Sequence, residues 1–213
     1  MALIVSSWRW GTRYGDEYVE RLKAGVARNL AQPYEFRVFE PEREDVYLTA
    51  LPGCFCRLRA FDPAWQRRQG LREGDRIVCL DLDLIVTVSL DGLFDGPEPF
   101  GILQGVNASN PGRFNGSVWW TTAGYRPDVW TDFSLEAAQA VPFFSFPDDQ
   151  AWLEAKLPDA AAIGPEQGVY GFCKPGWNTG TALPKNARIV AFPGWRDPVG
   201  FGHLSWVAEH WRV

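Results

Sequence analysis

Two aspartates interrupt the apolar run RIVCLDLDLIV at residues 76 to 86. Carboxylates that enter a protein core cost several kcal/mol unless they are paired or bind a metal, so Asp81 and Asp83 either reach solvent or hold something. If the chain is still extended here, side chains two residues apart point to the same side. Two adjacent carboxylates repel each other unless a cation lies between them. A hard divalent ion such as Mg²⁺ or Mn²⁺, also bound to phosphate oxygens of a nucleotide, would offset both the cost of burying the carboxylates and their repulsion.

The bare D-x-D spacing does not decide between two interpretations. A solvated strand end followed by a helix cap explains the two aspartates about as well as a ligand site does, because short motifs often match by chance. The elements that surround the motif must therefore decide between them.

The order of elements around the motif predicts an α/β fold. Residues 3 to 5 form a short buried-strand pattern, apolar residues at helical spacing follow between 16 and 30, and residues 34 to 40 alternate as a strand does. This order is typical of the start of a βαβ unit with a parallel sheet. The strand before Asp81 is apolar on both faces up to Leu80, as expected of a central parallel strand. Ligands in open α/β sheets bind at the carboxyl ends of such strands, where Asp81 stands.

Further elements are predicted along the rest of the chain. Residues 57 to 71 read as a basic helical or irregular segment, residues 100 to 105 and 116 to 121 as strands, residues 148 to 157 as a helix with an acidic cap, and residues 187 to 194 as a last strand. The loops between them are long and rich in Gly, Pro, Asn and Trp, which is typical of binding loops.

Composition limits the class of protein. The 213 residues fit one domain spanning 1 to 213, and the net charge of -5 without a run of Lys or Arg argues against a nucleic-acid partner. The amino terminus reads as a strand rather than a signal peptide, and no window is long enough to span a bilayer. Four cysteines without CxxC pairs and two histidines argue against structural zinc, so we expect a reduced, cytoplasmic protein. The eleven tryptophans fit either a core or platforms for sugar rings.

Five segments, in order, resemble those of GT-A glycosyltransferases, most closely the retaining glycogenin-like and bacterial lipopolysaccharide galactosyltransferase-like group. VCLDLDLIVTVSLDGLF is similar to the D-x-D strand of that group with its "sLdeLf" continuation, and WGTRYGDEYVERLKAGVARNL to its nucleotide-binding first loop and helix. FNGSVWW, DDQAWL and RIVAFPGWRDP resemble its "fNsGvm", "DQdaL" and terminal "iiHFxGxxKPW" segments. The resemblance covers nearly the whole chain. It implies the GT-A nucleotide-diphospho-sugar transferase fold, a Rossmann-like mixed central sheet flanked by helices.

The resemblance also implies roles for individual residues. Asp81 and Asp83 correspond to the pair that binds Mn²⁺ (or Mg²⁺) and the donor diphosphate. Arg57 corresponds to the cation on that diphosphate, although a solvated surface arginine explains it about as well. The implied catalytic residues, which approach the donor sugar and the acceptor, are Asp149, Asn115 and Gln150, with Asp148 either sharing this role or only capping a helix. The implied donor-binding residues are Trp10, Gly11, Thr12, Tyr14, Arg57, Asp81, Leu82, Asp83, Gly194 and Arg196.

The chain departs from the pattern at the last segment. The third metal ligand of the family is a histidine, and Ala191 stands in its place. The lysine of the family's "KP" falls at Asp197, with Arg196 next to it as a substitute charge. The expected metal site then consists of Asp81 and Asp83, either with fewer protein ligands than in the family or with His203 reaching back as a further ligand. A packed or surface imidazole is the other interpretation of His203.

The function implied is metal-assisted, retaining transfer of a hexose from a nucleotide-diphosphate sugar, a UDP-sugar being expected, to a glycan or protein acceptor. One alternative is a haloacid-dehalogenase-type phosphatase with Asp81 as nucleophile, Asp83 as acid/base and the Asp148–Asp149 pair on a metal. A sugar nucleotidyltransferase would need glycines before WGTRYG that are absent. An inactive carbohydrate-binding homologue is the third alternative. The donor sugar, the base, the acceptor and the oligomeric state are left open by the sequence.

Overall fold

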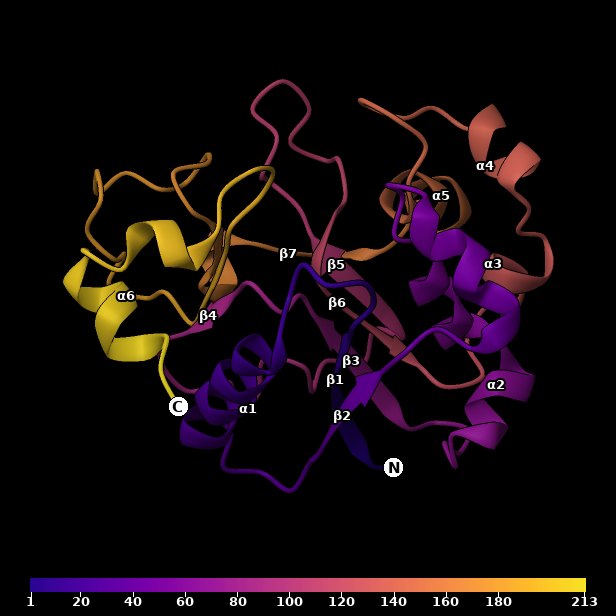
Figure 1. The fold of residues 1–213 in the computed structure, drawn as a ribbon, viewed down its shortest axis with the longest axis horizontal. Coiled ribbons are helices and arrows are strands. Elements are labelled where there is room, and N and C mark those ends of the chain that lie inside the picture. The colour runs from indigo at the N-terminus through magenta and orange to yellow at the C-terminus, as the bar shows by residue number, and fades with distance from the viewer.

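The computed structural model describes residues 1–213, and its strands form two sheets (Figure 1). The larger sheet has six strands in the order β2-β1-β3-β6-β5-β7, and the smaller has three in the order β4-β9-β8. The strands are β1 (Leu3–Trp8), β2 (Glu35–Phe39), β3 (Arg76–Leu80), β4 (Ile85–Val86), β5 (Phe100–Leu103), β6 (Asn115–Thr122), β7 (Ala161–Ile163), β8 (Val169–Gly171) and β9 (Ile189–Ala191).

Helices cover both faces of the larger sheet. They are α1 (Asp16–Asn29), α2 (Pro63–Arg68), α3 (Asp128–Thr131), α4 (Leu135–Ala140), α5 (Asp149–Lys156) and α6 (Ser205–His210), with short 3-10 helices at Arg43–Ala50, Phe55–Phe61, Pro165–Gln167 and Pro198–Phe201. Figure 1 shows α1, α6 and the small sheet to the left of the central strands and α2 to α5 to the right. None of these helices combines the length and the apolar character that crossing a membrane requires.

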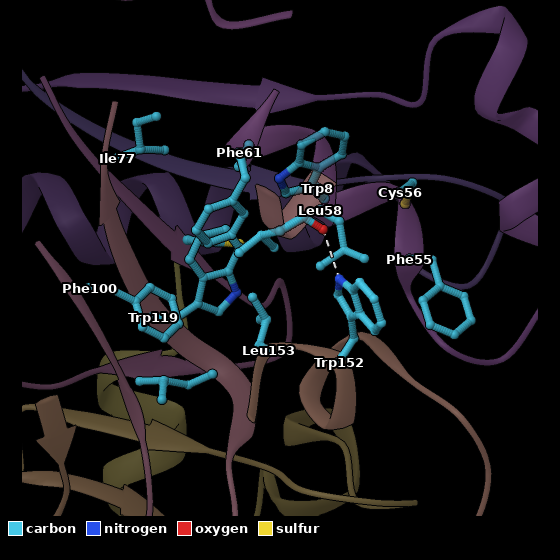
Figure 2. Close-up of a cluster of buried hydrophobic side chains, with 14 of the residues drawn as sticks. Trp8, Phe55, Cys56, Leu58, Phe61, Ile77, Phe100, Trp119, Trp152 and Leu153 are labelled. Carbon is cyan, nitrogen blue, oxygen red and sulfur yellow. Dashed lines mark hydrogen bonds between the residues drawn. The ribbon is translucent and has the colours of Figure 1, made fainter. Parts of the chain in front are cut away.

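Two hydrophobic clusters, one on each face, hold this arrangement together. The strands alternate between them, so that Ile4 and Trp8 of β1 join one cluster and Val5 joins the other. The cluster on the α2–α5 side is rich in aromatic rings (Figure 2), and the indole Nε1 of Trp152 donates to the backbone carbonyl of Val129 at 2.8 Å. Most of the tryptophans are therefore core: the buried ones are Trp8, Trp65, Trp119, Trp120, Trp152, Trp177 and Trp206.

The strand directions make a mixed sheet, as expected. Strand β1 pairs in parallel with β2 and with β3, and β6 runs antiparallel to β3. The carboxyl ends of β1 and β3 therefore lie beside the amino end of β6. Strand β3 ends at Leu80, and the amide of Asp81 still donates to the carbonyl of Ser117 at 2.9 Å. The chain turns at Leu82 and Asp83, so the condition for both carboxylates pointing to the same side, an extended chain, does not hold.

Most predicted elements are confirmed, with differences at their ends. The first strand continues to Trp8, three residues beyond the apolar run, because the buried Ser6 and Ser7 stay in register with β2. The basic segment 57 to 71 divides into a 3-10 helix and α2 at Asp62, whose carboxylate caps the amide of Ala64. The predicted last strand corresponds to β9, whereas its partners β4 and β8 and the helix α6 were not predicted, because elements this short leave too short a pattern to recognise.

Candidate active site

A cavity of about 420 Å³ opens where the carboxyl ends of β1 and β3 meet the amino end of β6. The predicted site residues that line it are Trp10, Tyr14, Arg57, Asp81, Leu82, Asp83, Asn115, Asp149, Gln150 and Gly194. Gly11 and Thr12 line a neighbouring cavity of about 610 Å³ that shares Trp10 and Tyr14 with the first. Arg196 and His203 line neither cavity.

The floor of the cavity is a charge cluster of the buried Arg57 and Asp149 and the half-buried Asp81. The Nε of Arg57 donates to Oδ2 of Asp149 at 2.7 Å, and its Nη1 donates to Oδ1 of Asp81 at 2.7 Å. Nη1 also donates to the carbonyl of Gly116 at 2.9 Å. Arg57 is 5 % exposed, so its interpretation as a solvated surface charge is wrong. Although burial disfavours the charged guanidinium, the carboxylates of Asp149 and Asp81 hold the pKa of Arg57 well above its ordinary value.

The hydrogen bonds of Arg57 limit what it can offer a ligand. A guanidinium has five N–H groups. Three of them are taken by Asp149, Asp81 and Gly116, and Nη2 lies 2.7 Å from Oδ2 of Asp149. Few N–H groups are left for a diphosphate, so in this arrangement Arg57 mainly binds and orients the two aspartates.

Gly116 makes room for this cluster. A Cβ at position 116 would lie 2.4 Å from Nη2 of Arg57 and 3.1 Å from Cγ of Gln150. The backbone amide of Gly116 also donates to Oε1 of Gln150 at 2.7 Å, which holds that side chain against β6. The sequence reasoning did not single out Gly116, although a small residue between Asn115 and Ser117 at the start of a strand is a sign of close packing.

Asp148 and Asp149 have separate roles in the structure. Oδ1 of Asp148 accepts from the amide of Ala151 at 2.8 Å, so Asp148 caps α5 while Asp149 points inward and is 1 % exposed. Oδ1 of Asp149 is buried and has no hydrogen-bond partner. Burial raises the pKa of Asp149 to about 6, against the lowering effect of the Arg57 charge. This oxygen is a hydrogen-bond acceptor that the protein itself leaves unsatisfied.

Asp83 belongs to a second network, which leads to the carboxy-terminal segment. The phenol of Tyr14 donates to Oδ2 of Asp83 at 2.7 Å, and the rings of Tyr14 and Tyr18 meet edge to face with centroids 4.9 Å apart. Tyr18 in turn donates to the carboxylate of Asp197 at 3.0 Å. Burial, followed by the charge of Asp81, raises the pKa of Asp83 to about 7. A cation beside Asp83 would offset both effects.

The donor set suits a metal only in part. No three His, Cys, Asp or Glu side chains gather in a way that could hold a metal ion. Asp81 and Asp83 supply hard oxygen ligands, and Mg²⁺ sites in proteins often use one or two carboxylates completed by substrate phosphates and water. The residues therefore fit a divalent ion whose coordination is completed by water or ligand oxygens, rather than a metal site made by the protein alone.

The carboxy-terminal segment contributes less than predicted to the cavity. Ala191 is fully buried in β9, and His203 is exposed with its ring beside Phe201, outside the cavity lining. The carboxylate of Asp197, besides accepting from Tyr18, caps the amide of Val199. The guanidinium of Arg196 lies 5.5 Å from the ring centroid of Trp195. The placement of His203 gives no support to its predicted role as a metal ligand.

Comparison with solved structures identifies the fold. A glycosyltransferase involved in the glycosylation of the major capsid of PBCV-1 matches with a TM-score of 0.59 and 16% identity, over 92% of this chain and 95% of that one. The galactosyltransferase LgtC, solved in complex with donor and acceptor sugar analogs, matches with a TM-score of 0.57 and 12% identity, over 100% of this chain and 97% of that one.

A third match is longer than this chain. The glycosyltransferase GlyE of Streptococcus pneumoniae TIGR4 matches with a TM-score of 0.61 and 15% identity, over 98% of this chain but only 62% of that one. No protein-family model matches the sequence, and a search of curated proteins finds no significant sequence match. The structural matches show that the chain has the GT-A fold, which confirms the predicted fold class.

Proposed function

We propose that this chain is a glycosyltransferase that moves a hexose from a nucleotide-diphosphate sugar to an acceptor. The observation that carries the proposal is the position of Asp81 and Asp83: they follow the central strand β3 directly and line the cavity of a GT-A fold. The carboxyl end of a central strand is where ligands of open α/β sheets bind. Structures with this fold include glycosyltransferases, one of them solved with donor and acceptor sugar analogs.

Asp81 and Asp83 would hold Mn²⁺ or Mg²⁺ together with the diphosphate of the donor. When bound, the metal neutralises negative charge on the leaving diphosphate. The ion pair with Arg57 fixes the orientation of Asp81, and the hydrogen bond from Tyr14 fixes that of Asp83. Both carboxylates are therefore positioned before the ligand arrives, which lowers the entropy cost of binding.

The floor beside the metal site would bind the transferred sugar. Oδ1 of Asp149, buried and without a partner, offers an acceptor to a sugar hydroxyl. Asn115 and Gln150 line the same part of the cavity and supply amide groups that both donate and accept. We propose that the acceptor hydroxyl oxygen bonds to the anomeric carbon on the face from which the diphosphate leaves, so that the configuration is retained without a covalent intermediate. The bond from the anomeric carbon to the diphosphate breaks, and the hydroxyl proton passes to the leaving diphosphate.

The remaining expectations stay part of the proposal. UDP-hexose is the proposed donor, residues 1 to 213 are proposed to form one catalytic domain, and the cytoplasm, where the free cysteines would stay reduced, is the proposed compartment.

The phosphatase alternative receives no support from the site. Asp148 caps a helix and Asp149 is paired with Arg57, so the two do not form the metal pair that this alternative requires.

Thermal unfolding with nucleotides tests the proposal. The wild-type chain would be melted with UDP or GDP, each with and without Mn²⁺, alongside Asp83→Ala and the control Asp159→Ala at an exposed position. A ligand at a hundred times its dissociation constant adds about 2.7 kcal/mol of stability. We expect a metal-dependent shift in the wild type and in Asp159→Ala, and none in Asp83→Ala. If neither nucleotide shifts the melting temperature under any metal condition, the cavity is not a donor site.

A further inference from the structure

Four exposed aromatic side chains lie on two segments that each contribute to the lining of the cavity: Phe143, Phe144, Phe146 and Trp195, which we call the aromatic rim. Their exposed fractions are 41%, 72%, 42% and 83%. The three phenylalanines lie between α4 and α5 and Trp195 lies between β9 and α6, segments that Figure 1 shows at the upper right and upper left of the central strands. Phe146 and Gly194 line the cavity itself, so the rim continues from its walls.

The two segments of the rim are anchored at their bases. The carbonyl of Pro147 packs so closely on Gly53 that a Cβ there would lie 2.7 Å from it, and the amide of Asp149 donates to the carbonyl of Gly53 at 2.8 Å. On the other side, Asp197 is held by the phenol of Tyr18. The rings therefore project from fixed bases. Large exposed apolar groups on segments that border a cavity are typical of a binding surface.

Arginines accompany the rings of the rim. The guanidinium of Arg113 lies 5.9 Å from the ring centroid of Phe144, and that of Arg196 lies 5.5 Å from that of Trp195. Both arginines are half-buried, and neither takes part in any of the ion pairs of the structure. In a chain of net charge -5, two cations without ion-pair partners beside the rings of the rim suit an anionic ligand.

The charge of the floor indicates that the anion at the rim is a different ligand from the donor. The charged residues that line the cavity are four aspartates, Asp81, Asp83, Asp148 and Asp149, and two arginines, Arg13 and Arg57, so carboxylates outnumber cations there. An anionic ligand without a metal is repelled from these carboxylates and attracted to the arginines at the rim. An acceptor must bring one hydroxyl to the donor sugar at the floor, so the rest of the acceptor has to lie across the rim.

We propose that the aromatic rim with Arg113 and Arg196 binds the acceptor, and that this acceptor is a glycan carrying carboxylate or phosphate groups. Ring faces of Phe144 and Trp195 would pack against the C–H faces of its sugars, and the guanidinium of Arg113 would bind its acidic groups. Arginine suits this role because its planar fork matches carboxylate and phosphate oxygens. This inference rests on the proposed function, because the reaction defines what an acceptor is.

An array of neutral, carboxylated and phosphorylated glycans tests the proposal. The labelled chain of residues 1 to 213 would be applied with UDP and Mn²⁺, and compared with Trp195→Ser, Phe144→Ser, Arg113→Gln and the control Arg72→Gln, an exposed arginine of the α2–β3 turn. We expect the wild type and Arg72→Gln to bind acidic glycans. Each rim aromatic variant should weaken binding about tenfold, the equivalent of about 1.4 kcal/mol. Arg113→Gln should abolish the preference for acidic over neutral glycans.

Three outcomes would overturn the proposal. They are binding to neutral glycans alone, binding to no glycan, and an unchanged preference for acidic glycans in Arg113→Gln.

Vesicles of phosphatidylserine and phosphatidylcholine test an anionic membrane as the other ligand. If the vesicles bind the chain through the same residues and glycans do not, the rim contacts membranes instead. The nucleotide-dependent thermal shift, measured on the same variants, separates this proposal from the preceding one. Glycan binding without any nucleotide shift would contradict the transferase function and indicate a carbohydrate-binding protein.

Discussion

The floor and the rim of the same cavity are built in opposite ways. At the floor, Arg57 and Asp149 are almost fully buried and their charges are satisfied by one another. At the rim, Phe144 and Trp195 are largely exposed and the nearby Arg113 has no ion-pair partner. Apart from Oδ1 of Asp149, the charged groups of the floor thus find their partners within the protein. At the rim, by contrast, the rings are exposed to solvent and the arginine is unpaired.

This difference indicates how the two regions divide the proposed work. A buried charge cluster holds its groups in one geometry, which suits a step in which the donor must be oriented closely. Exposed rings and free arginines adapt to a ligand but contribute little to the stability of the fold. Substitutions should therefore destabilise the chain at the floor and change binding without destabilising it at the rim.

The largest effect is expected from Arg57→Met. Removing the guanidinium leaves the carboxylate of Asp149 buried and unpaired, and breaking a buried ion pair in this way costs about 3–5 kcal/mol of stability. Urea unfolding would measure the loss. The double variant Arg57→Met with Asp149→Leu should recover much of it, since replacing a buried pair with apolar groups is often neutral. A loss below about 1 kcal/mol in the single variant would contradict the description of the floor as a charge cluster.

A smaller loss is expected from Gly116→Ala. The added methyl group would lie 2.4 Å from Nη2 of Arg57, so the guanidinium or the strand must move. Overpacking of this kind costs about 1–3 kcal/mol. The control is Gly200→Ala, where a Cβ meets nothing within 4 Å. Equal stability of the two variants in urea would show that Arg57 is not packed against β6 as described.

Asp83 should make the metal-free chain less stable as the pH rises. Its pKa in the folded chain is about 7, because of burial and the charge of Asp81, whereas its ordinary value is 3.8. Between about pH 4 and about pH 7 the folded state binds more protons at this group than the unfolded state, so the contribution of Asp83 to stability falls across that window and is constant above it.

Comparison with Asp83→Asn isolates this contribution from those of other carboxylates. The free energy of unfolding of both proteins would be measured with a chelator present from pH 4 to pH 8. The difference in stability, wild type minus Asp83→Asn, should decrease up to about pH 7 and then level off. A difference that is flat or increases across this range would contradict the burial of an unpaired charge at Asp83.

The smallest effect on stability is expected at the rim. Phe144→Ser and Trp195→Ser alter exposed side chains, so each should change the free energy of unfolding by no more than about 0.5 kcal/mol. Both variants should keep the metal-dependent thermal shift with nucleotide, because neither residue belongs to the floor. A loss of several kcal/mol in either variant would show that the rim is part of the core, and the contrast between the two regions would fail.

The sequence predicted the floor better than the rim, for physical reasons. Asp81 and Asp83 stood out because a carboxylate after an apolar strand is costly, and this holds whatever the tertiary structure is. The side-chain role of Arg57 depends on Asp149, which lies 92 residues away, so local patterns could indicate a cation but not its partner. The sequence left open whether Asp148 only caps the helix, and the structure places its Oδ1 on the amide of Ala151, in the capping position.

The rest of the site required the tertiary structure. Composition could not separate core tryptophans from sugar platforms, and only Trp195 of the eleven is largely exposed. The segment PFFSFP, residues 142 to 147, contains three phenylalanines between two prolines, a pattern that could have indicated an exposed aromatic loop. Whether His203 reaches the metal site depends on the path of the turn-rich segment that carries it. Sequence periodicity does not describe such a path.

Electron paramagnetic resonance of Mn²⁺ tests the central claim most directly, because the spectrum of the free ion loses intensity when the ion binds protein. The account predicts weak binding of Mn²⁺ by the chain alone, since only Asp81 and Asp83 supply ligands, and strong binding when UDP is added. Asp83→Ala should abolish the nucleotide-dependent binding, and Asp159→Ala should leave it unchanged. Mn²⁺ binding that is unaffected by UDP and GDP, or that persists in Asp83→Ala, would contradict the assignment of a nucleotide-sugar site to the end of β3.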